Sequence, residues 1–312
     1  MRGKENPPPA GGGRLRMEAR KRWADGVARL QAGGIEAGEA ERMLQWLAAA
    51  EWSCGLLEVR ERWAAGVGDE FWPRWDDGVK RLERGEPVQY VIGETEFWGL
   101  RFFCDKRALI PRPETERLVE AAVEFLTERL HTGEHQAARK PVRVVDVCTG
   151  SGCVACALAR QLGEKICVTG RDISAEALSL ARQNAKALGA AVLFEQADLL
   201  EGLAAGSVDL VTANPPYVTT AECATLPQNV RDWEPRLALD GGADGLHLIS
   251  RLVAEAANVL SWGGRLVMEI GEDQAPAVRE LLCQKTLPIR MLEVRRDYAG
   301  RDRVVIAECN RR

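Results

Sequence analysis

Histidine is scarce in this chain of 312 residues, which has only three. His131 and His135 have the four-residue spacing of a helix face, but Gly133 and polar neighbours favour a solvated loop. The nine cysteines offer one C-x-x-C spacing, Cys153 with Cys156, and no second pair. We therefore expect no metal site and no disulfide framework, and we interpret the cysteines as small core residues of a cytoplasmic protein.

Long apolar runs are also absent. No segment approaches the roughly 20 apolar residues that a membrane-spanning helix needs, so we expect no association with a membrane. Residues 1–16 are rich in Pro, Gly and Arg but have no apolar centre, which excludes a secretory signal peptide. We expect a disordered leader over this stretch.

An excess of positive charge is missing as well. The formal net charge is −4 at pH 7 and the pI is about 5.7, so the chain has no protein-wide cationic surface for nucleic acid. The hydrophobic share of 46% and the charged share of 28% are ordinary for a soluble globular protein. The length suggests about two domains. We expect a monomer that does not contact nucleic acid directly.

Residues 17–86 carry apolar side chains at helical spacing, interrupted by glycines, which predicts a small domain of short helices. Six of the nine tryptophans lie here, and most should form the core of this domain. One or two rings exposed for contact with a partner are the alternative. These residues are Trp23, Trp46, Trp52, Trp63, Trp72 and Trp75.

A change of pattern follows over residues 87–107, which we interpret as a linker. Within it, residues 90–103 read as strands with a Gly-centred turn and predict a β-hairpin. Two prolines then keep residues 109–116 extended. The helix and the polar linker that come next are expected over residues 116–130 and 131–141.

From residue 142 onward, expected strands alternate with expected helices. This alternation predicts a mostly parallel sheet with helices on both faces, an α/β Rossmann-like domain over residues 108–312. The last two strands are joined by a short loop and should form an antiparallel edge pair. The strands are expected at residues 142–147, 166–171, 192–196, 208–213, 265–270, 291–296 and 303–309, and the helices at 152–162, 175–188, 246–260 and 274–282.

Three acidic residues mark the ends of the first three strands of this domain. Asp146 precedes a loop with Gly150 and Gly152, Asp172 ends the second strand, and Asp198 follows the third. Ligands of open parallel sheets bind beyond the carboxyl ends of the strands. Each aspartate alone is more often a helix cap or turn residue, but the three together favour a nucleoside site.

The acids, the Gly loop and the lack of a basic clamp match S-adenosylmethionine, which carries an ammonium group, a ribose and an adenine but no phosphate. We assign Asp146 to the ammonium group, Asp172 to the ribose diol and Asp198 to the adenine amino group. The other candidate cofactor contacts are Cys148, Thr149, Gly150, Ser151, Gly152, Ile173, Leu199 and Asn214.

The tetrapeptide Asn214-Pro215-Pro216-Tyr217 follows an apolar strand. The first proline keeps Asn214 out of the helical region, and neither proline donates a backbone hydrogen bond, so the bend is rigid and rich in carbonyl oxygens. Such a bend can accept both hydrogens of a planar NH2 group, with an aromatic ring beside it. We therefore assign Asn214, Pro215 and Tyr217 to catalysis and the whole tetrapeptide to substrate binding; a plain proline turn is the alternative.

These motifs resemble one family, the peptide chain release factor glutamine methyltransferases (PrmC/HemK). The segment Ile110-Pro111-Arg112-Pro113-Glu114-Thr115-Glu116 is the most specific part, because related DNA methyltransferases share Asn-Pro-Pro-Tyr but not this segment. The family usually has Gly where this chain has Cys148, a departure that is tolerable if the backbone dihedral angles there are ordinary. The resemblance runs from about Gly85 to the C-terminus, more loosely through the helical domain, and includes Pro87-Val88-Gln89-Tyr90, Phe97-Trp98-Gly99-Leu100, Glu234-Pro235 and Gly300-Arg301-Asp302-Arg303-Val304.

The resemblance implies a class I S-adenosylmethionine-dependent methyltransferase with a helical substrate-recognition domain and a connecting β-hairpin. The implied substrate is the glutamine of the Gly-Gly-Gln motif in class 1 peptide chain release factors. Methylation of its side-chain amide nitrogen would tune translation termination and leave S-adenosylhomocysteine. Trp98 and Phe102 would wall the glutamine pocket or else belong to the hairpin core. Arg112 would help to cap the cofactor or else form a structural ion pair with an acid.

The segment from residue 218 to 245 is long for a connection within a compact domain and is typical of a lid or a binding loop. Its candidate contacts to the release factor, each of which could equally be a solvated side chain, are Asn229, Arg231, Glu234 and Arg236.

Three other functions stay open on the sequence alone. A methyltransferase acting on a ribosomal-protein glutamine would use the same site. A DNA amino-methyltransferase would need base extrusion and a basic groove, which the acidic pI disfavours. A nucleotide-binding or adaptor module could keep the fold, but it would have no use for the amide clamp at Asn214.

Overall fold

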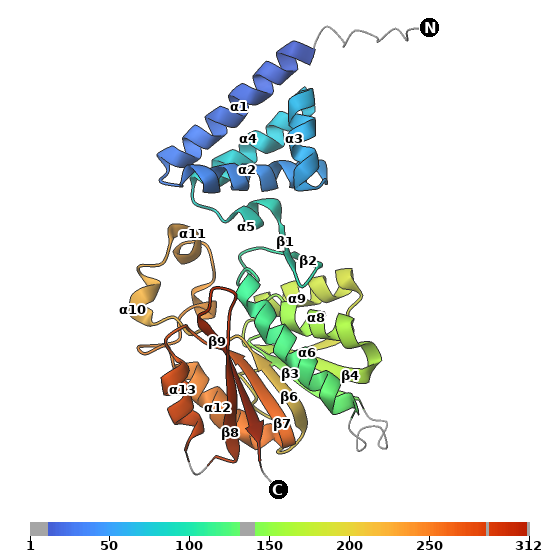
Figure 1. Cartoon of the computed structure of the whole chain (residues 1–312), viewed down its shortest axis with the longest axis vertical. Helices are drawn as coiled ribbons and strands as arrows, with labels where there is room; N and C mark the ends of the chain where they lie inside the picture. The colour runs from blue at the N-terminus through green and yellow to red at the C-terminus, as the bar shows by residue number, and fades with distance from the viewer. Residues whose placement is uncertain (1–11, 132–140, 285–286, 311–312) are drawn as a thin grey trace. The chain divides into compact units, whose positions relative to one another are not determined.

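The computed structural model describes residues 12–131, 141–284 and 287–310 (Figure 1). The chain divides into two compact units after Gly93. Most of the expected leader, and nearly all of the polar linker with His135, lie outside the described residues. Residues 12–16 are described and are helical rather than disordered, because they form the start of a long helix whose Ala19 is fully buried.

The first unit consists, in its described residues, of short helices around an aromatic core. The ring of Trp63 lies 4.7 Å from Trp23, 5.6 Å from Trp52 and 4.9 Å from Trp75, measured between centroids. Trp46, in contrast, is 41% exposed, so the sequence-based expectation of a mainly internal set with an exposed ring is confirmed. The helices are α1 (Gly12–Ala32), α2 (Ala37–Trp52), α3 (Leu56–Ala65), α4 (Trp72–Glu83) and α5 (Val88–Ile92).

Helix α5 corrects the expected start of the β-hairpin, because residues 90–92 belong to this helix and not to a strand. Pro87 precedes its first turn, and Gly93, with φ of 86°, ends it. The guanidinium of Arg81 donates to the carbonyl oxygens of Tyr90 and Val91 at 3.1 Å each. These carbonyls lie in the last turn of the helix, so the bonds from Arg81 stabilise a helix that the β-branched residues alone would disfavour.

The second unit begins with the hairpin itself, formed by β1 (Glu94–Phe97) and β2 (Leu100–Phe103). The turn consists of Trp98 and Gly99, with φ of 53° and 67°. Positive φ at both central residues is the geometry that matches the twist of a tight hairpin.

A seven-stranded sheet forms the centre of the second unit, in the order β5-β4-β3-β6-β7-β9-β8. Strands β3 to β7 are parallel, and β9 runs antiparallel between β7 and β8. The antiparallel pair predicted for the end of the chain is confirmed. Of its two strands, only β8 lies at an edge of the sheet, because β9 lies between β7 and β8. The strands are β3 (Val142–Val147), β4 (Ile166–Asp172), β5 (Val192–Gln196), β6 (Val208–Ala213), β7 (Leu260–Glu269), β8 (Ile289–Arg296) and β9 (Asp302–Cys309).

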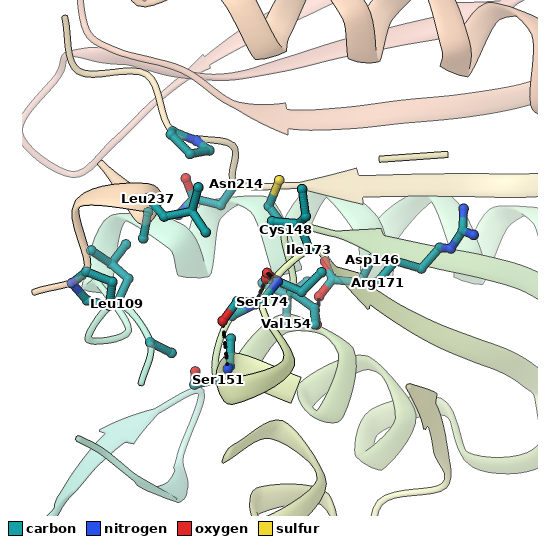
Figure 2. Close-up of a pocket in the computed structure, with 18 of the residues that line it drawn as sticks. Leu109, Asp146, Cys148, Ser151, Val154, Arg171, Ile173, Ser174, Asn214 and Leu237 are labelled. Carbon is teal, nitrogen blue, oxygen red and sulfur yellow. Dashed lines mark hydrogen bonds between the residues drawn. The ribbon is translucent and has the colours of Figure 1, made fainter. Parts of the chain in front are cut away.

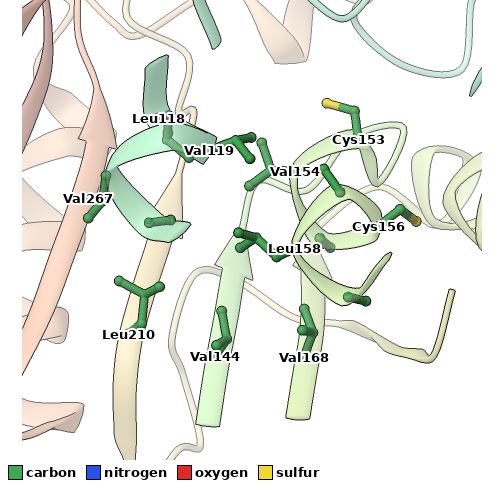
Figure 3. Close-up of a cluster of buried hydrophobic side chains, with 14 of the residues drawn as sticks. Leu118, Val119, Val144, Cys153, Val154, Cys156, Leu158, Val168, Leu210 and Val267 are labelled. Atoms are coloured by element: carbon green, nitrogen blue, oxygen red, sulfur yellow. The ribbon is translucent and has the colours of Figure 1, made fainter. Parts of the chain in front are cut away.

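Helices cover both faces of the sheet, which explains why every residue of β6 is buried. On one face, Leu118, Leu158 and Leu178 pack over the strands, and Figure 3 shows the first two above Val144 and Leu210. The other face carries a second cluster with Ile249 and Val278. The covering helices are α6 (Glu116–His131), α8 (Cys153–Leu162) and α9 (Ala175–Leu188) on the first face, and α12 (His247–Val259) and α13 (Ala275–Leu282) on the second.

The long segment after β6 contains the short helices α10 (Thr220–Cys223) and α11 (Gln228–Arg231). Strand order reverses between β3 and β6, which places a ligand-binding crevice at the carboxyl ends of these strands. Among the helices of the described residues, none is long and apolar enough to cross a membrane. The same residues hold no group of three or more His, Cys, Asp or Glu side chains arranged to bind a metal ion.

Candidate active site

A pocket opens beyond the carboxyl ends of β3, β4 and β6, and Figure 2 shows most of the residues that line it. It contains all three acids that the sequence pointed to, together with Asn214 and Pro216. Two segments outside the strand ends complete the walls. They are the stretch before α6, with Leu109, Ile110, Pro111, Arg112 and Thr115, and the loop after β6, with Pro235, Leu237 and Ala238.

In the loop between β3 and α8, every second residue has a positive φ. The angle φ is 54° at Cys148, 54° at Gly150 and 77° at Gly152. A Cβ atom at Gly152 would lie 3.0 Å from the Cβ atom of Ala181, so glycine also lets the loop pack closely against α9.

The backbone of Cys148 departs from the expectation that the dihedral angles there are ordinary. Its φ lies in the left-handed region, which costs a residue with a side chain about 1 kcal/mol. The strain gives a physical reason why glycine would suit this position better than cysteine. Burial raises the pKa of the Cys148 thiol, and the carboxylates of Asp172 and Asp146 add to the effect.

Asp146 is almost completely buried, with 2% of its surface exposed. Its two carboxylate oxygens accept hydrogen bonds from the hydroxyls of Thr149 at 2.6 Å and Thr212 at 2.7 Å. Burial raises the pKa of this carboxyl to about 6 despite these bonds. Asp146 therefore holds the Gly loop to β6, in addition to facing the pocket where a cationic group of a ligand would lie.

Asp172 connects the Gly loop to the start of α9. Its carboxylate accepts the backbone N–H groups of Gly150 and Ser174, both at 2.9 Å. Burial raises the pKa of this carboxyl as well. The next residue, Ile173, is 52% exposed and lines the pocket, so it offers an apolar surface to a flat ring beside the acid.

Asp198 has a partner that sequence reasoning did not find, because Arg251 of α12 donates to its carboxylate at 2.9 Å. A second arginine, Arg171, is buried at the end of β4 and donates to the carbonyl oxygens of Leu199 at 3.1 Å and Glu201 at 2.9 Å. Leu199 has φ of 46°, and Arg171 thus fixes a strained turn directly after Asp198.

Asn214 is anchored by one end of its amide. The side-chain nitrogen donates to the hydroxyl of Thr115 at 3.2 Å, and this hydroxyl donates in turn to the carboxylate of Glu269 at 2.6 Å. Among the described residues, no hydrogen bond reaches the side-chain oxygen of Asn214 or the carbonyl oxygen of Pro215. Both acceptors thus keep unused lone pairs, although only Asn214 lines the pocket, whereas Pro215 is buried and is not among the lining residues.

Tyr217 is not among the residues that line the pocket, and its hydroxyl donates to the carboxylate of Glu269 at 3.1 Å. Burial and the carboxylate of Glu269 raise the pKa of this phenol. Tyr217 is consequently a neutral hydrogen-bond donor whose ring is fixed beside the Asn-Pro-Pro bend. The signal that identified Asp146 and Asp172, an acid at the carboxyl end of an apolar strand, would also have identified Glu269.

Phe102 and Trp98 do not line the pocket. Phe102 is fully buried in the core under the hairpin, where its ring centroid lies 6.1 Å from that of Phe97. Trp98 packs against the same core, and its backbone N–H donates to Glu116 at 2.7 Å. The alternative of a hairpin core is confirmed for Phe102, and the prediction that it walls a substrate pocket is wrong because no surface of it is accessible.

The long loop contains one residue whose expected role is wrong. Glu234 cannot be a surface contact, since its side chain is only 1% exposed and it pairs with Arg112. Asn229 is exposed, and the exposed side chains of Arg231 and Arg236 pair with Asp232 at 2.7 Å and Asp240 at 3.0 Å. Of the two roles considered for Arg112, the structure shows the ion pair with an acid, and Arg112 also lines the pocket.

Two family models match this chain. One is described as the PrmC N-terminal domain and covers residues 23–93. The other is described as a methyltransferase domain and covers residues 138–291. The two matches correspond to the helical unit and to most of the unit that carries the pocket.

Relatives of named function match the chain over most of its length. A release factor glutamine methyltransferase of Moorella thermoacetica is 40% identical over 93% of this chain and 98% of its own. A protein of the same name from Deinococcus radiodurans is 38% identical over the same shares. A solved structure of a release-factor-specific protein-(glutamine-N5) methyltransferase from Alicyclobacillus acidocaldarius is 27% identical, covers 65% of this chain and 95% of its own, and has a TM-score of 0.38.

Proposed function

Because the chain belongs to the family of release factor glutamine methyltransferases, we propose that it methylates the side-chain amide nitrogen of the glutamine in the Gly-Gly-Gln motif of class 1 release factors. The observation that carries this proposal is the anchored Asn214. Its amide nitrogen is bound to Thr115, which leaves the side-chain oxygen as an acceptor at the pocket.

The residues around the pocket fit S-adenosylmethionine as methyl donor. Three acids face it, and the guanidinium groups that line it are already bound to carboxylates or carbonyls: Arg107 to Asp105, Arg112 to Glu234, Arg171 to backbone oxygens and Arg251 to Asp198. A ligand with phosphate groups would find no unpaired cation among them. A cationic nucleoside instead meets Asp146 for its ammonium group, Asp172 for its ribose and Asp198 for its adenine. When bound, this donor supplies an electrophilic methyl group on sulfur.

The contribution of Asn214 and Pro215 is to orient the substrate amide. The side-chain oxygen of Asn214 and the carbonyl oxygen of Pro215 accept the two N–H bonds of the glutamine amide. This fixes the plane of the amide and directs the electron density of its nitrogen toward the methyl group, so that catalysis depends on positioning and preoriented dipoles. Tyr217 cannot serve as a base because its hydroxyl is bound to Glu269 and its pKa is raised. The amide proton therefore leaves to water after the transfer.

The helical unit would contact the release factor away from the loop that bears the glutamine. Support comes from large apolar side chains on its surface, since Trp46 is 41% exposed, Leu56 46% and Leu57 84%. Where such side chains gather into one patch, they mark a surface that binds another protein. We further propose that the enzyme acts in the cytoplasm as a monomer and without direct contact to nucleic acid.

A labelling experiment tests the proposed substrate. The protein is incubated with radiolabelled S-adenosylmethionine and, in separate reactions, with a class 1 release factor, its Gly-Gly-Gln variant with Gln→Ala, ribosomal protein or DNA. We expect label in the intact release factor alone. Label in DNA, or equal label in the Gln→Ala variant, would exclude the proposal, and label in ribosomal protein would assign the enzyme to that substrate.

Substitution of Asn214 tests the clamp. Asn214→Ala should bind the cofactor with nearly unchanged affinity, measured by calorimetry, and lose about 100-fold or more in the rate of transfer. A loss of cofactor affinity in place of transfer would show that Asn214 belongs to the cofactor site and not to the substrate clamp.

A further inference from the structure

We propose that Glu269 and Thr115 are positioning residues that determine which end of the Asn214 amide faces the substrate. The inference rests on the proposed role of Asn214 in binding the glutamine amide. It concerns residues that do not themselves touch the substrate, and it assigns them a function in transfer and not in cofactor binding.

The three residues come from distant parts of the chain and meet at one place. Thr115 lies just before α6, Asn214 follows β6, and Glu269 ends β7. Thr115 and Glu269 are buried, with 2% and 1% of their surfaces exposed, and Thr115 lines the pocket together with Asn214, whereas Glu269 lies behind them. The hydrogen bonds run in one line, from Asn214 to Thr115 at 3.2 Å and from Thr115 to Glu269 at 2.6 Å.

The direction of this line follows from what each group can donate. Both oxygens of Glu269 accept hydrogen bonds, one from Tyr217 and one from Thr115, so Glu269 takes the single hydroxyl proton of Thr115. The oxygen of Thr115 then has only lone pairs left for Asn214, and it must receive the NH2 end of the amide. The Asn214 oxygen is consequently turned the other way, toward the pocket. Without this constraint, the two ends of an Asn side chain are nearly equal in shape and would interchange by a rotation.

The surroundings of Glu269 keep its carboxylate occupied by donors. Tyr217 donates to its second oxygen at 3.1 Å. Burial raises the pKa of Glu269, and the hydrogen bond from Thr115 and the positive charge of Arg303 oppose this effect. Arg303 is itself fixed, because it donates to the carbonyl oxygen of Ile270 at 3.1 Å and to Asp297 at 3.3 Å. The network is therefore rigid and shielded from water, as a device for orientation requires.

The reverse orientation of Asn214 would hinder the substrate directly. Its NH2 group would then face the NH2 group of the glutamine, and two donors would meet without an acceptor between them. One of the two N–H bonds of the substrate would lose its partner, and the nitrogen would no longer be aimed at the methyl group. A wrongly turned Asn214 is thus expected to reduce turnover while the cofactor site stays intact.

The test compares two substitutions of Thr115 that differ only in the hydroxyl group. Thr115→Ser keeps the donor and acceptor, and Thr115→Val removes both at nearly unchanged shape. With a release factor as substrate, we expect Thr115→Val to lower kcat about 100-fold and Thr115→Ser to retain most of it. The dissociation constant for S-adenosylmethionine should stay within about twofold in both. Thr127→Val, at an exposed hydroxyl that donates to Val123 at 2.7 Å, is the matched control.

A double-mutant cycle tests whether Glu269 acts through Thr115. Glu269→Gln should lower kcat about tenfold and yet leave the melting temperature equal or higher, because it removes a buried charge. In the double variant with Thr115→Val, kcat should be no lower than in Thr115→Val alone, since the two residues act as one unit. Should Glu269→Gln not fold, Thr115→Val and Thr115→Ser alone decide the matter.

Three results would overturn the proposal: a kcat of Thr115→Val within about threefold of the unsubstituted enzyme, equal losses in Thr115→Val and Thr115→Ser, or losses that multiply in the double variant. The reaction of the unsubstituted enzyme distinguishes a failure of this proposal from a failure of the proposed function. If the unsubstituted enzyme does not label the release factor, the substrate assignment fails, and the cycle is then carried out with whichever substrate in the labelling experiment accepts the methyl group.

Discussion

The guanidinium of Arg112 donates to the carboxylate of Glu234, which also accepts the backbone N–H of Ile110 at 3.1 Å. The two residues are 122 positions apart in the chain. Their pairing joins the segment before α6 to the loop after α11, and both segments line the same pocket. The side chain of Glu234 is 1% exposed, so Arg112 supplies the positive charge that balances a buried acid.

Removal of this ion pair should loosen the wall of the pocket. Arg112→Ala leaves the buried carboxylate of Glu234 with only a backbone donor, and we expect a loss of about 2 kcal/mol in the free energy of unfolding and a cofactor affinity about tenfold lower. Denaturant unfolding and calorimetry measure the two effects. Arg236→Ala removes an exposed pair in the same loop and should change stability by less than about 0.5 kcal/mol. Equal behaviour of the two variants would contradict the prediction.

Because the backbone at Cys148 is left-handed, glycine at this position should stabilise the protein relative to alanine. Cys148→Gly and Cys148→Ala both remove the thiol, but only glycine is free of strain at φ of 54°. The glycine variant should therefore be more stable than the alanine variant by about 1 kcal/mol, as measured by denaturant unfolding. An alanine variant of equal or greater stability would show that the backbone changes its conformation when the side chain is replaced.

The buried carboxyl of Asp146 predicts a pH dependence of stability. Its pKa in the folded protein is about 6, against an ordinary value of 3.8. Between these values the folded protein keeps a proton that the unfolded chain releases, so this carboxyl makes the protein less stable as pH rises from about 4 to 6. Above pH 6 the full cost is present, about 3 kcal/mol.

Asp146→Asn removes this titration. The stability of the natural protein minus that of the variant should therefore fall by about 3 kcal/mol between pH 4 and pH 7, measured by denaturant unfolding at a series of pH values. Asp273→Asn removes an exposed carboxyl and serves as the control. A difference that is constant over this range would mean that Asp146 titrates normally.

Gly170 allows the aromatic ring of Phe194 to lie directly over the sheet. A Cβ atom there would approach this ring to 2.7 Å and the hydroxyl of Thr149 to 2.9 Å. Gly170→Ala should lower the free energy of unfolding by about 2 kcal/mol and weaken cofactor binding, because Thr149 holds Asp146. Gly13→Ala, where nothing lies within 4 Å, is the matched control and should not destabilise the protein. Similar unfolding curves for both variants would refute the prediction.

The parallel part of the fold could be predicted closely because its signals are local. Each central strand is a short apolar run, and each helix shows an apolar face, so β3, β4, β5, β6 and α9 lie where the sequence placed them. The sequence predicted a strand where the structure has α5, because contacts with a residue outside this segment determine its conformation. Val91 and Ile92 favour a strand by themselves, whereas the bonds from Arg81 to the last turn stabilise a helix. The start of β7 was missed because Gly263 and Gly264 interrupt its apolar pattern.

In the candidate site, too, local features could be predicted, whereas contacts between distant segments could not. The three acids were predicted to line one pocket because the carboxyl ends of parallel strands meet, and they do so. Their distant partners could not be predicted, since Thr212 reaches Asp146 and Arg251 reaches Asp198 from other elements. Phe102 was misassigned for a related reason. Its strand alternates in burial, and the sequence does not tell which face of a two-stranded hairpin meets the core.

The burial of Cys148 has a consequence for the survival of the enzyme itself. The proposed methyl donor is an alkylating agent, and a cysteine thiolate in the same pocket would be the strongest nucleophile near it. Because burial and the neighbouring acids raise the pKa of this thiol, it stays protonated and reacts poorly. The acids that would attract the cationic donor thus also protect the enzyme from methylating itself.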